Sequence, residues 1–162
     1  MPQNKAYLLI GGNIGDRMMA LSNAREAIEK HCGDIIRKSS VYETAAWGNE
    51  DQAAFLNQAL EIETDQTAEE LLKKILESEE ILGRKRALQY GPRIIDIDVL
   101  FFNNNIIQHD GLKVPHPRMQ YRRFVLVPLN EIAPGMIHPV LQKSVNELLM
   151  QCTDPLAVNK FN

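Results

Sequence analysis

Hydrophobic residues in the first half of the chain follow two different periods. Residues 5–10 read as a short strand and 53–64 alternate as a strand does, whereas 17–32 carries apolar or small residues at helical spacing. Residues 35–44 are a further strand candidate. We expect 35–44 and 53–64 to pair antiparallel, because only the loop AAWGNEDQ separates them.

A capping box, formed by Thr67 and Glu70, starts a helix that we expect to run to about Gly83. Glu79 falls on the inner, apolar stripe of this helix near its end. Because helix boundaries are uncertain by a turn, Glu79 either reaches solvent or faces a site beside the helix.

The C-terminal third of the chain is less regular. Three asparagines at 103–105 predict a hairpin turn, and the two prolines of KVPHPRM impose an irregular or extended segment. The stretch FVLVPLNEIAPG suits either a strand or a helix. A second capping box, Ser144 with Glu147, predicts a final short helix that ends at about Cys152.

The resulting order of elements, βαββαβ with two hairpin-like junctions, predicts an α+β fold. We expect a ferredoxin-like sandwich with a mostly antiparallel sheet and C-terminal additions. Length and composition indicate one domain over residues 1–162, because 44% hydrophobic and 24% charged residues are typical of a globular chain with its own core.

The overall charge excludes some classes of partner. A net charge of −3 gives no general attraction to nucleic acid or to anionic membranes. No signal peptide or membrane-spanning stretch is visible, and Cys32 and Cys152 lack the spacing of metal-binding or redox cysteines. We therefore expect a cytoplasmic protein with reduced cysteines that binds neither nucleic acid nor membrane.

Two aspartates interrupt GPRIIDIDVLFF, a run that otherwise resembles a buried strand. Alternation puts Asp96 and Asp98 on one face of this strand. The other face is predicted to carry Ile95, Ile97, Val99 and Phe101. Two carboxylates so placed lie about 7 Å apart and need a positive charge between them, from a metal ion or from arginines. The alternative is that they protect an edge strand or form salt bridges.

Four basic residues lie within ten positions just before these aspartates: Arg84, Lys85, Arg86 and Arg93. Such a run is often a solvated helix end that complements the helix dipole. Beside the aspartates it has a second interpretation, because arginine binds phosphate oxygens while magnesium takes carboxylate and phosphate oxygens together. The combination predicts a site for a magnesium-bound nucleoside triphosphate.

Two other stretches carry candidate binding residues. His116, in VPHPRM, either donates to a phosphate or merely ends an extended segment. Trp47, Phe55 and Asn57 lie in YETAAWGNEDQAAFLN. Two aromatic rings and an amide can sandwich and hydrogen-bond a flat heterocycle, although aromatic residues in strands more often belong to the core.

Seven motifs follow one another along nearly the whole chain: LLIGGNIGDR, YETAAWG, FLNQAL, ESEEILGRKR, YGPRIIDIDVL, VPHPRM and RRFVLVPLNEIAP. In this order they resemble the 6-hydroxymethyl-7,8-dihydropterin pyrophosphokinases of folate biosynthesis, and GPRxxDxD followed by VPHP is highly specific. The resemblance implies transfer of the terminal diphosphate of ATP to the hydroxymethyl group of the pterin. The products would be AMP and the pterin diphosphate.

The same resemblance implies a role for individual residues. Asp96 and Asp98 would hold two magnesium ions on the triphosphate, and Arg84 and Arg93 would stabilise the transition state. The residues implied to bind ATP are Arg84, Lys85, Arg86, Arg93, His116 and Arg122. Those implied to line the pterin pocket are Thr44, Trp47, Phe55, Asn57 and Phe124. We expect a monomer whose partners are these two small molecules.

Two other functions remain compatible with the residues alone. One is another magnesium-dependent phosphotransferase or nucleotidyltransferase on a ferredoxin-like sheet. The other is a non-catalytic nucleotide- or RNA-binding module, although the acidic net charge and the lack of an aromatic RNA-binding signature argue against it.

Overall fold

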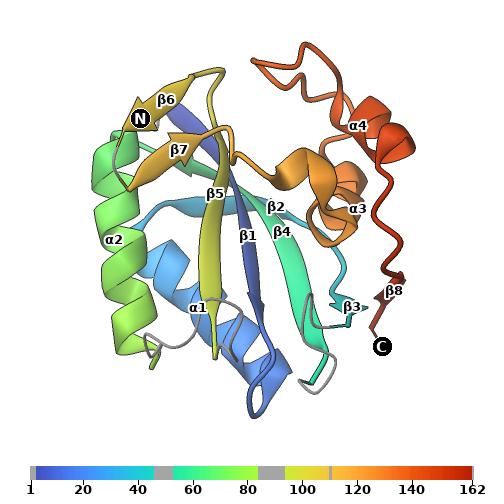
Figure 1. Ribbon diagram of the computed structural model, residues 1–162. Coiled ribbons are helices and arrows are strands. Elements are labelled where there is room, and N and C mark those ends of the chain that lie inside the picture. The colour runs from blue at the N-terminus through green and yellow to red at the C-terminus, as the bar shows by residue number, and fades with distance from the viewer. Residues whose placement is uncertain (1–2, 46–52, 84–93, 110, 162) are drawn as a thin grey trace.

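The computed structural model of the chain describes residues 3–45, 53–83, 94–109 and 111–161 (Figure 1). Its strands are β1 (Asn4–Gly12), β2 (Asp34–Lys38), β3 (Tyr42–Thr44), β4 (Phe55–Thr64), β5 (Asp96–Phe102), β6 (Ile107–His109), β7 (Leu112–Val114) and β8 (Val158–Lys160). Its helices are α1 (Arg17–His31), α2 (Ala68–Ile81), α3 (Arg123–Ile132) and α4 (Val145–Gln151), with a 3-10 turn at Met119–Tyr121.

The main sheet has the order β5-β1-β4-β3-β8, and β2 also pairs with β4. All of its described pairs are antiparallel. The predicted strand 35–44 is divided into β2 and β3, and both parts pair with β4 as expected. At the division, the Ser39 hydroxyl accepts a hydrogen bond from Ala59 N at 2.9 Å. The predicted ferredoxin-like architecture is confirmed, with β1 and β4 at its centre.

Helices cover both faces of the sheet. In Figure 1, α1 and α2 lie against one face, while α3 and α4 lie against the other. The alternation of β1 explains the division, because Leu8 and Ile10 enter the core beneath α1 and α2 whereas Tyr7 and Leu9 enter the core beneath α3. No helix in the described ranges is long and apolar enough to cross a membrane.

Local signals set the helix boundaries. Both predicted capping boxes are present, because the side chains of Thr67 and Ser144 each accept a hydrogen bond from the backbone of the glutamate three residues on. Gly33 follows Cys32, the residue that caps the end of α1. A side chain at this glycine would collide with the Glu63 carbonyl, so close approach to β4 favours glycine here.

Strand β5 departs from the predicted alternation. Its pairing with β1 shifts by one residue between Tyr7 and Leu8, so Leu100 is an extra residue in β5. Phe101 was predicted on the face of Val99. This prediction is wrong, because the bulge turns Phe101 into the core beneath α3 while Val99 stays on the other side.

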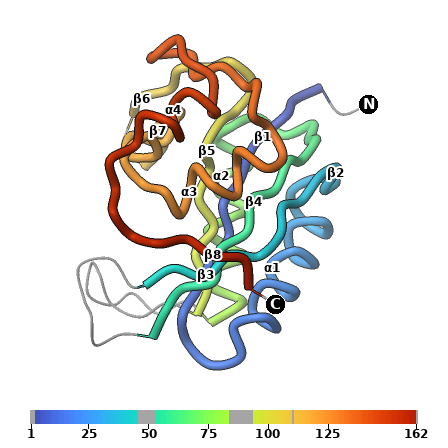
Figure 2. The backbone as a smooth tube through the Cα atoms, turned by 90° about the vertical axis from the view of Figure 1, so that its right-hand side faces the viewer, coloured from blue at the N-terminus to red at the C-terminus, as the bar shows by residue number. Residues whose placement is uncertain are grey.

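Other differences lie in the C-terminal part. The predicted hairpin at 103–105 is wrong, because β6 after this turn pairs with β7 and not with β5. The ambiguous stretch FVLVPLNEIAPG is helical and forms most of α3, with Pro128 inside the helix. The short strand β8, which sequence reasoning missed, pairs with β3 and extends the sheet (Figure 2).

Leu60 offers a test of this core, because its side chain is fully buried in the middle of β4. We expect Leu60→Ala to lower the free energy of unfolding by roughly 2–5 kcal/mol, through lost burial and the cavity left behind. Urea denaturation followed by circular dichroism measures this. Ile81→Ala is the matched control, because Ile81 is 76% exposed and should change stability by no more than about 0.5 kcal/mol. Equal losses in the two variants would contradict the assigned packing.

Candidate active site

The candidate residues gather on one face of the sheet, the face that α3 covers. Directly opposed residues of neighbouring strands share a face, and Asp96, Gly11, Asn57 and Tyr42 form one such row across β5, β1, β4 and β3. The row lies where β1 ends and where β3, β4 and β5 begin (Figure 1). With neighbouring strands about 4.8 Å apart, Asp96 lies about 10 Å from Asn57.

The predicted carboxylate pair occupies the start of β5. Asp96 is partly buried and Asp98, opposite Leu9, is exposed on the same face. Oxygen ligands of this kind suit magnesium, which usually takes one or two protein carboxylates together with substrate phosphates. The described ranges contain no cluster of three or more His, Cys, Asp or Glu residues able to hold a metal by itself. The donors present therefore fit an ion that is shared with a phosphate.

Glu79 is bound to the strand that carries the aspartates. Its side chain is 5% exposed, so the interpretation that it reaches solvent is wrong. Its Oε2 accepts a hydrogen bond at 2.8 Å from the backbone N of Ile97, the residue between Asp96 and Asp98. The carboxylate thus holds the peptide that joins the two candidate ligands.

Two buried polar residues, Asn57 and Thr44, lie on the same sheet face as the aspartates, and we refer to them as the pocket floor. Asn57 is 5% exposed, and a side chain at Gly11 would overlap its Oδ1, so the bare glycine leaves room for the amide. Thr44 is also buried, and its Oγ1 has no hydrogen-bond partner among the described residues. Buried polar groups are normally paired, so the Thr44 hydroxyl is suited to a ligand, and the Asn57 amide lies on the same face.

Two aromatic rings accompany this floor. Phe55 is the direct partner of Thr44 and is partly buried. Phe124, in the first turn of α3, is also partly buried and packs at the edge of the core on this face. The Arg122 guanidinium carbon lies 5.6 Å from the centroid of the Phe124 ring. This cation–π contact joins a residue predicted to bind ATP to a residue predicted to bind the pterin.

His116 is held at the outer edge of β5. Its backbone N donates to Leu100 O at 3.0 Å, and its Nδ1 accepts from Arg118 N at 3.2 Å. Because Nδ1 accepts, the neutral ring carries its proton on Nε2. Burial, followed by the charges of Arg122 and Arg118, lowers the pKa of His116 to about 4. The imidazole is therefore a neutral donor at pH 7.

Five of the predicted site residues lie outside the described ranges: Trp47, Arg84, Lys85, Arg86 and Arg93. Their roles stay predictions from the sequence. The other eight are described, and pairing places Thr44, Phe55, Asn57, Asp96 and Asp98 on one face.

The turn GGNIGD has a structural role that sequence reasoning left unassigned. Asn13 Nδ2 donates to Ala53 O at 3.0 Å, just before Phe55 and the pocket floor. Asp16 caps α1 by accepting from Met19 N at 3.0 Å. The signal that could have indicated these roles is the turn itself, since asparagine and aspartate often bind nearby backbone.

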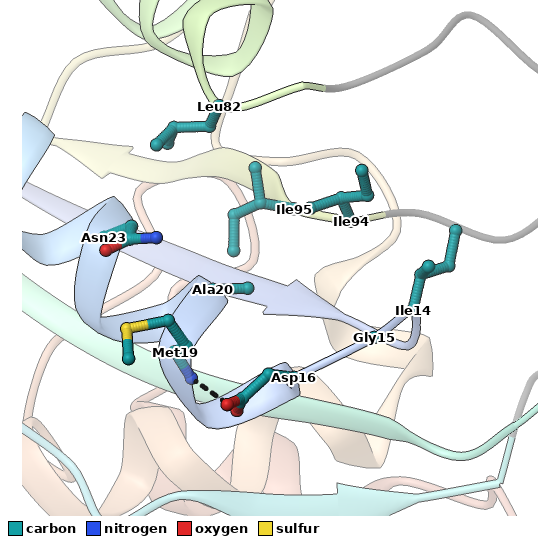
Figure 3. Close-up of a pocket in the computed structure, with 9 residues that line it drawn as sticks. All are labelled: Ile14, Gly15, Asp16, Met19, Ala20, Asn23, Leu82, Ile94 and Ile95. Carbon is teal, nitrogen blue, oxygen red and sulfur yellow. Dashed lines mark hydrogen bonds between the residues drawn. The ribbon is translucent and has the colours of Figure 1, made fainter.

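A cavity of about 220 Å³ adjoins this turn at Ile14, Gly15 and Asp16 (Figure 3). It is bounded by the turn, the first part of α1, the end of α2 at Leu82 and the approach to β5 at Ile94 and Ile95. Ile95 belongs to the core beneath α1 and α2. The cavity is therefore separate from the face that carries the aspartates.

Comparison with known proteins identifies relatives over most of the chain. A family model described as 7,8-dihydro-6-hydroxymethylpterin-pyrophosphokinase (HPPK) matches residues 7–134. A protein of Aquifex aeolicus named 2-amino-4-hydroxy-6-hydroxymethyldihydropteridine pyrophosphokinase is 43% identical over 141 residues, covering 87% of this chain and 88% of its own. One of the same name from Bacillus subtilis is 48% identical over 130 residues, covering 80% and 78%.

Solved structures agree with the fold. A crystal structure of a Plasmodium falciparum HPPK-DHPS triple mutant has a TM-score of 0.74 and 19% identity, and the match covers 93% of this chain but 44% of that longer chain. A structure titled as HPPK-DHPS in complex with substrates gives a TM-score of 0.71 at 17% identity, covering 93% and 43%. At such identities the likeness concerns the fold alone. Membership rests on the sequence matches, by which this chain belongs to the 7,8-dihydro-6-hydroxymethylpterin-pyrophosphokinase family.

Proposed function

We propose that this chain transfers the terminal diphosphate of ATP to the hydroxymethyl group of 6-hydroxymethyl-7,8-dihydropterin in folate biosynthesis. The hydroxymethyl oxygen bonds to the β-phosphorus and releases its proton. The bond between that phosphorus and the α,β-bridging oxygen breaks, and AMP leaves with the bridging oxygen. The observation that carries the proposal, beside family membership, is the row that joins Asp96 to Asn57 across one sheet face.

The pterin end of the proposed site is supported by two buried polar side chains. Asn57 and Thr44 are both buried, and Thr44 Oγ1 has no hydrogen-bond partner in the described part of the chain. A buried polar group without a partner is costly, and a group along a pterin edge would satisfy the Thr44 hydroxyl, while the Asn57 amide can bind the same edge. Phe55 and Phe124 would contact the faces of the ring, and Trp47 is assigned here from the sequence.

Magnesium is the cofactor that fits the other end of the row. Asp96 and Asp98 would hold the ions, two with each ATP, and Glu79 would keep the peptide between them in place. Bound magnesium supplies Lewis-acid chemistry that neutralises charge on the phosphates. The fit rests on the hard oxygen donors of this pair and on the exposure of Asp98 near the start of β5.

The chain's own contribution to phosphate binding is positive charge and donors. His116 Nε2–H and the Arg122 guanidinium would contact the nucleotide. Arg84, Lys85, Arg86 and Arg93 complete the proposal from the sequence, with Arg84 and Arg93 as transition-state donors. Catalysis of this transfer consists mainly of positioning and charge stabilisation, so fixed donors are the residues that it needs.

The rival assignment, another magnesium-dependent phosphotransferase or nucleotidyltransferase, is not favoured by the family match.

We further propose that the chain acts as a monomer in the cytoplasm. Both cysteines are free, as in proteins of reducing compartments. Light scattering during size-exclusion chromatography tests the monomer directly.

A product assay tests the proposed reaction. Purified protein with ATP, magnesium and 6-hydroxymethyl-7,8-dihydropterin should give AMP only when the pterin and the metal are both present. Separation of nucleotides by chromatography distinguishes this outcome from its rivals. Formation of ADP or of free pyrophosphate would assign the protein to the other transferase class.

Asp98→Ala should lower kcat by about two orders of magnitude or more, the scale on which removal of a preorganised electrostatic group acts. The free energy of unfolding should stay nearly unchanged, because Asp98 is exposed. Turnover at increasing magnesium and urea denaturation measure the two effects. Glu63→Ala, near the far end of β4 from the row, is a control that should keep full activity. Full activity in Asp98→Ala would contradict the proposal that Asp96 and Asp98 hold magnesium.

His116 supplies a pH prediction. Its folded pKa of about 4 lies below the usual 6.5, so the unfolded chain takes up the proton first as pH falls. The contribution of His116 to stability is therefore present above pH 6.5 and is lost between about 6.5 and 4. NMR titration of the ring protons should give a midpoint near 4. Unfolding of His116→Asn should depend less on pH over this window, whereas a midpoint near 6.5 would contradict the assigned burial.

A further inference from the structure

Arg17, the first residue of α1, connects the two strands that border the pocket floor. Its Nη1 lies 2.7 Å from Glu43 Oε2 in β3 and 2.9 Å from Ala54 O, immediately before β4. Residues 45–54 connect these two strands, so one guanidinium binds both ends of that connection. Its side chain is 23% exposed, which shields the ion pair partly from water.

Arg17 contacts β3 from the sheet face opposite to the one that carries Thr44. Side chains alternate along β3, so Glu43 points to the face of α1 while Thr44 points to the face of α3. Thr44 and Phe55 are the last described pair of the β3–β4 ladder on this side. Arg17 adds a further link between the two strands, from Glu43 within this ladder to Ala54 just before β4.

The C-terminal segment braces the same side chain. The Arg17 guanidinium carbon lies 5.2 Å from the centroid of the Phe161 ring. Phe161 N donates to Val41 O at 2.9 Å, and β8 pairs with the whole of β3 (Figure 2). Arg17 is therefore fixed from three directions, by a carboxylate, a carbonyl and an aromatic face.

We propose that Arg17 is a positioning residue for the pterin pocket, which holds the end of β3 and the start of β4 at a fixed separation. This inference rests on the proposed function. Thr44 and Asn57 can bind two groups of one rigid ring only if their strands keep this separation. Loss of Arg17 should therefore weaken pterin binding while leaving ATP binding unchanged, since none of its contacts reaches β5 or His116.

Arg17→Met tests the proposal, because methionine keeps much of the length and removes the charge and the donors. We expect the KM for the pterin to rise about tenfold, the factor that one charge-assisted hydrogen bond can supply. The KM for ATP should change less than about twofold. Arg17→Lys keeps the charge and can bind one of the two acceptors, so it should recover part of the pterin KM.

Arg25→Met is the matched control. Arg25 lies two turns further along α1, and its Nη1 also binds β4, at 2.7 Å from Gln58 Oε1. This contact joins the same helix to the same strand without touching either end of 45–54. Its loss should lower stability to a similar extent, as urea denaturation would show, and leave both KM values unchanged.

Glu43→Gln tests the same contact from the other side if Arg17→Met does not fold. Glutamine retains an acceptor for Arg17 and removes the charge, so the pterin KM should rise about threefold. An unchanged pterin KM in the folded variants, or equal changes in both KM values, would overturn the proposal. The wild type separates the two hypotheses: absence of AMP from the wild type contradicts the proposed function, whereas AMP with an unaltered pterin KM in Arg17→Met contradicts only the role of Arg17.

Discussion

The register of β1 between β4 and β5 is the constraint on which the site depends. Gly11 lies opposite Asn57 on one side and opposite Asp96 on the other, so one strand sets the distance between the two ends of the site. A slip of one residue would turn these side chains to the opposite face. The register is held by apolar packing, because Leu8 and Leu9 enter different cores. Burial beneath α1 and α3 therefore positions groups that themselves contribute little to the core.

Features of the fold that depend on local sequence could be predicted, and those that depend on a partner strand could not. Both capping boxes act within four residues and are present as expected. The position of Phe101 depends on a bulge that arises only when β5 pairs with β1. The hairpin predicted at 103–105 has its turn, with Asn103 in the left-handed region, but the following strand finds its partner in β7. Strand β8 has only three residues and acquires its conformation from β3.

The candidate site divides in the same way. Alternation alone was enough to place Asp96 and Asp98 on one face, since it needs only the strand period. The role of Glu79 could not be chosen from the sequence, because its partner Ile97 N lies 18 residues away on another element. The positioning role proposed for Arg17 could not be predicted from the sequence, since its acceptors lie 26 and 37 residues away. Helix-to-strand contacts of this kind become visible only when the packing of α1 and α2 on the sheet is known.

Positive charge beside β5 would allow an acidic chain to bind the proposed ATP. A net charge of −3 gives no general attraction to ATP, so positive charge must be concentrated locally. Arg118 and Arg122 lie near His116, which is tied to β5 at Leu100, two residues beyond Asp98. Their charges help to keep the imidazole neutral, and the ring contributes a donor without adding a third positive charge. Because its pKa is about 4, the charge that His116 contributes to this edge stays constant across neutral pH. A triphosphate bound here would have carboxylates at one end and arginines at the other. This difference in charge would fix its orientation along the strand.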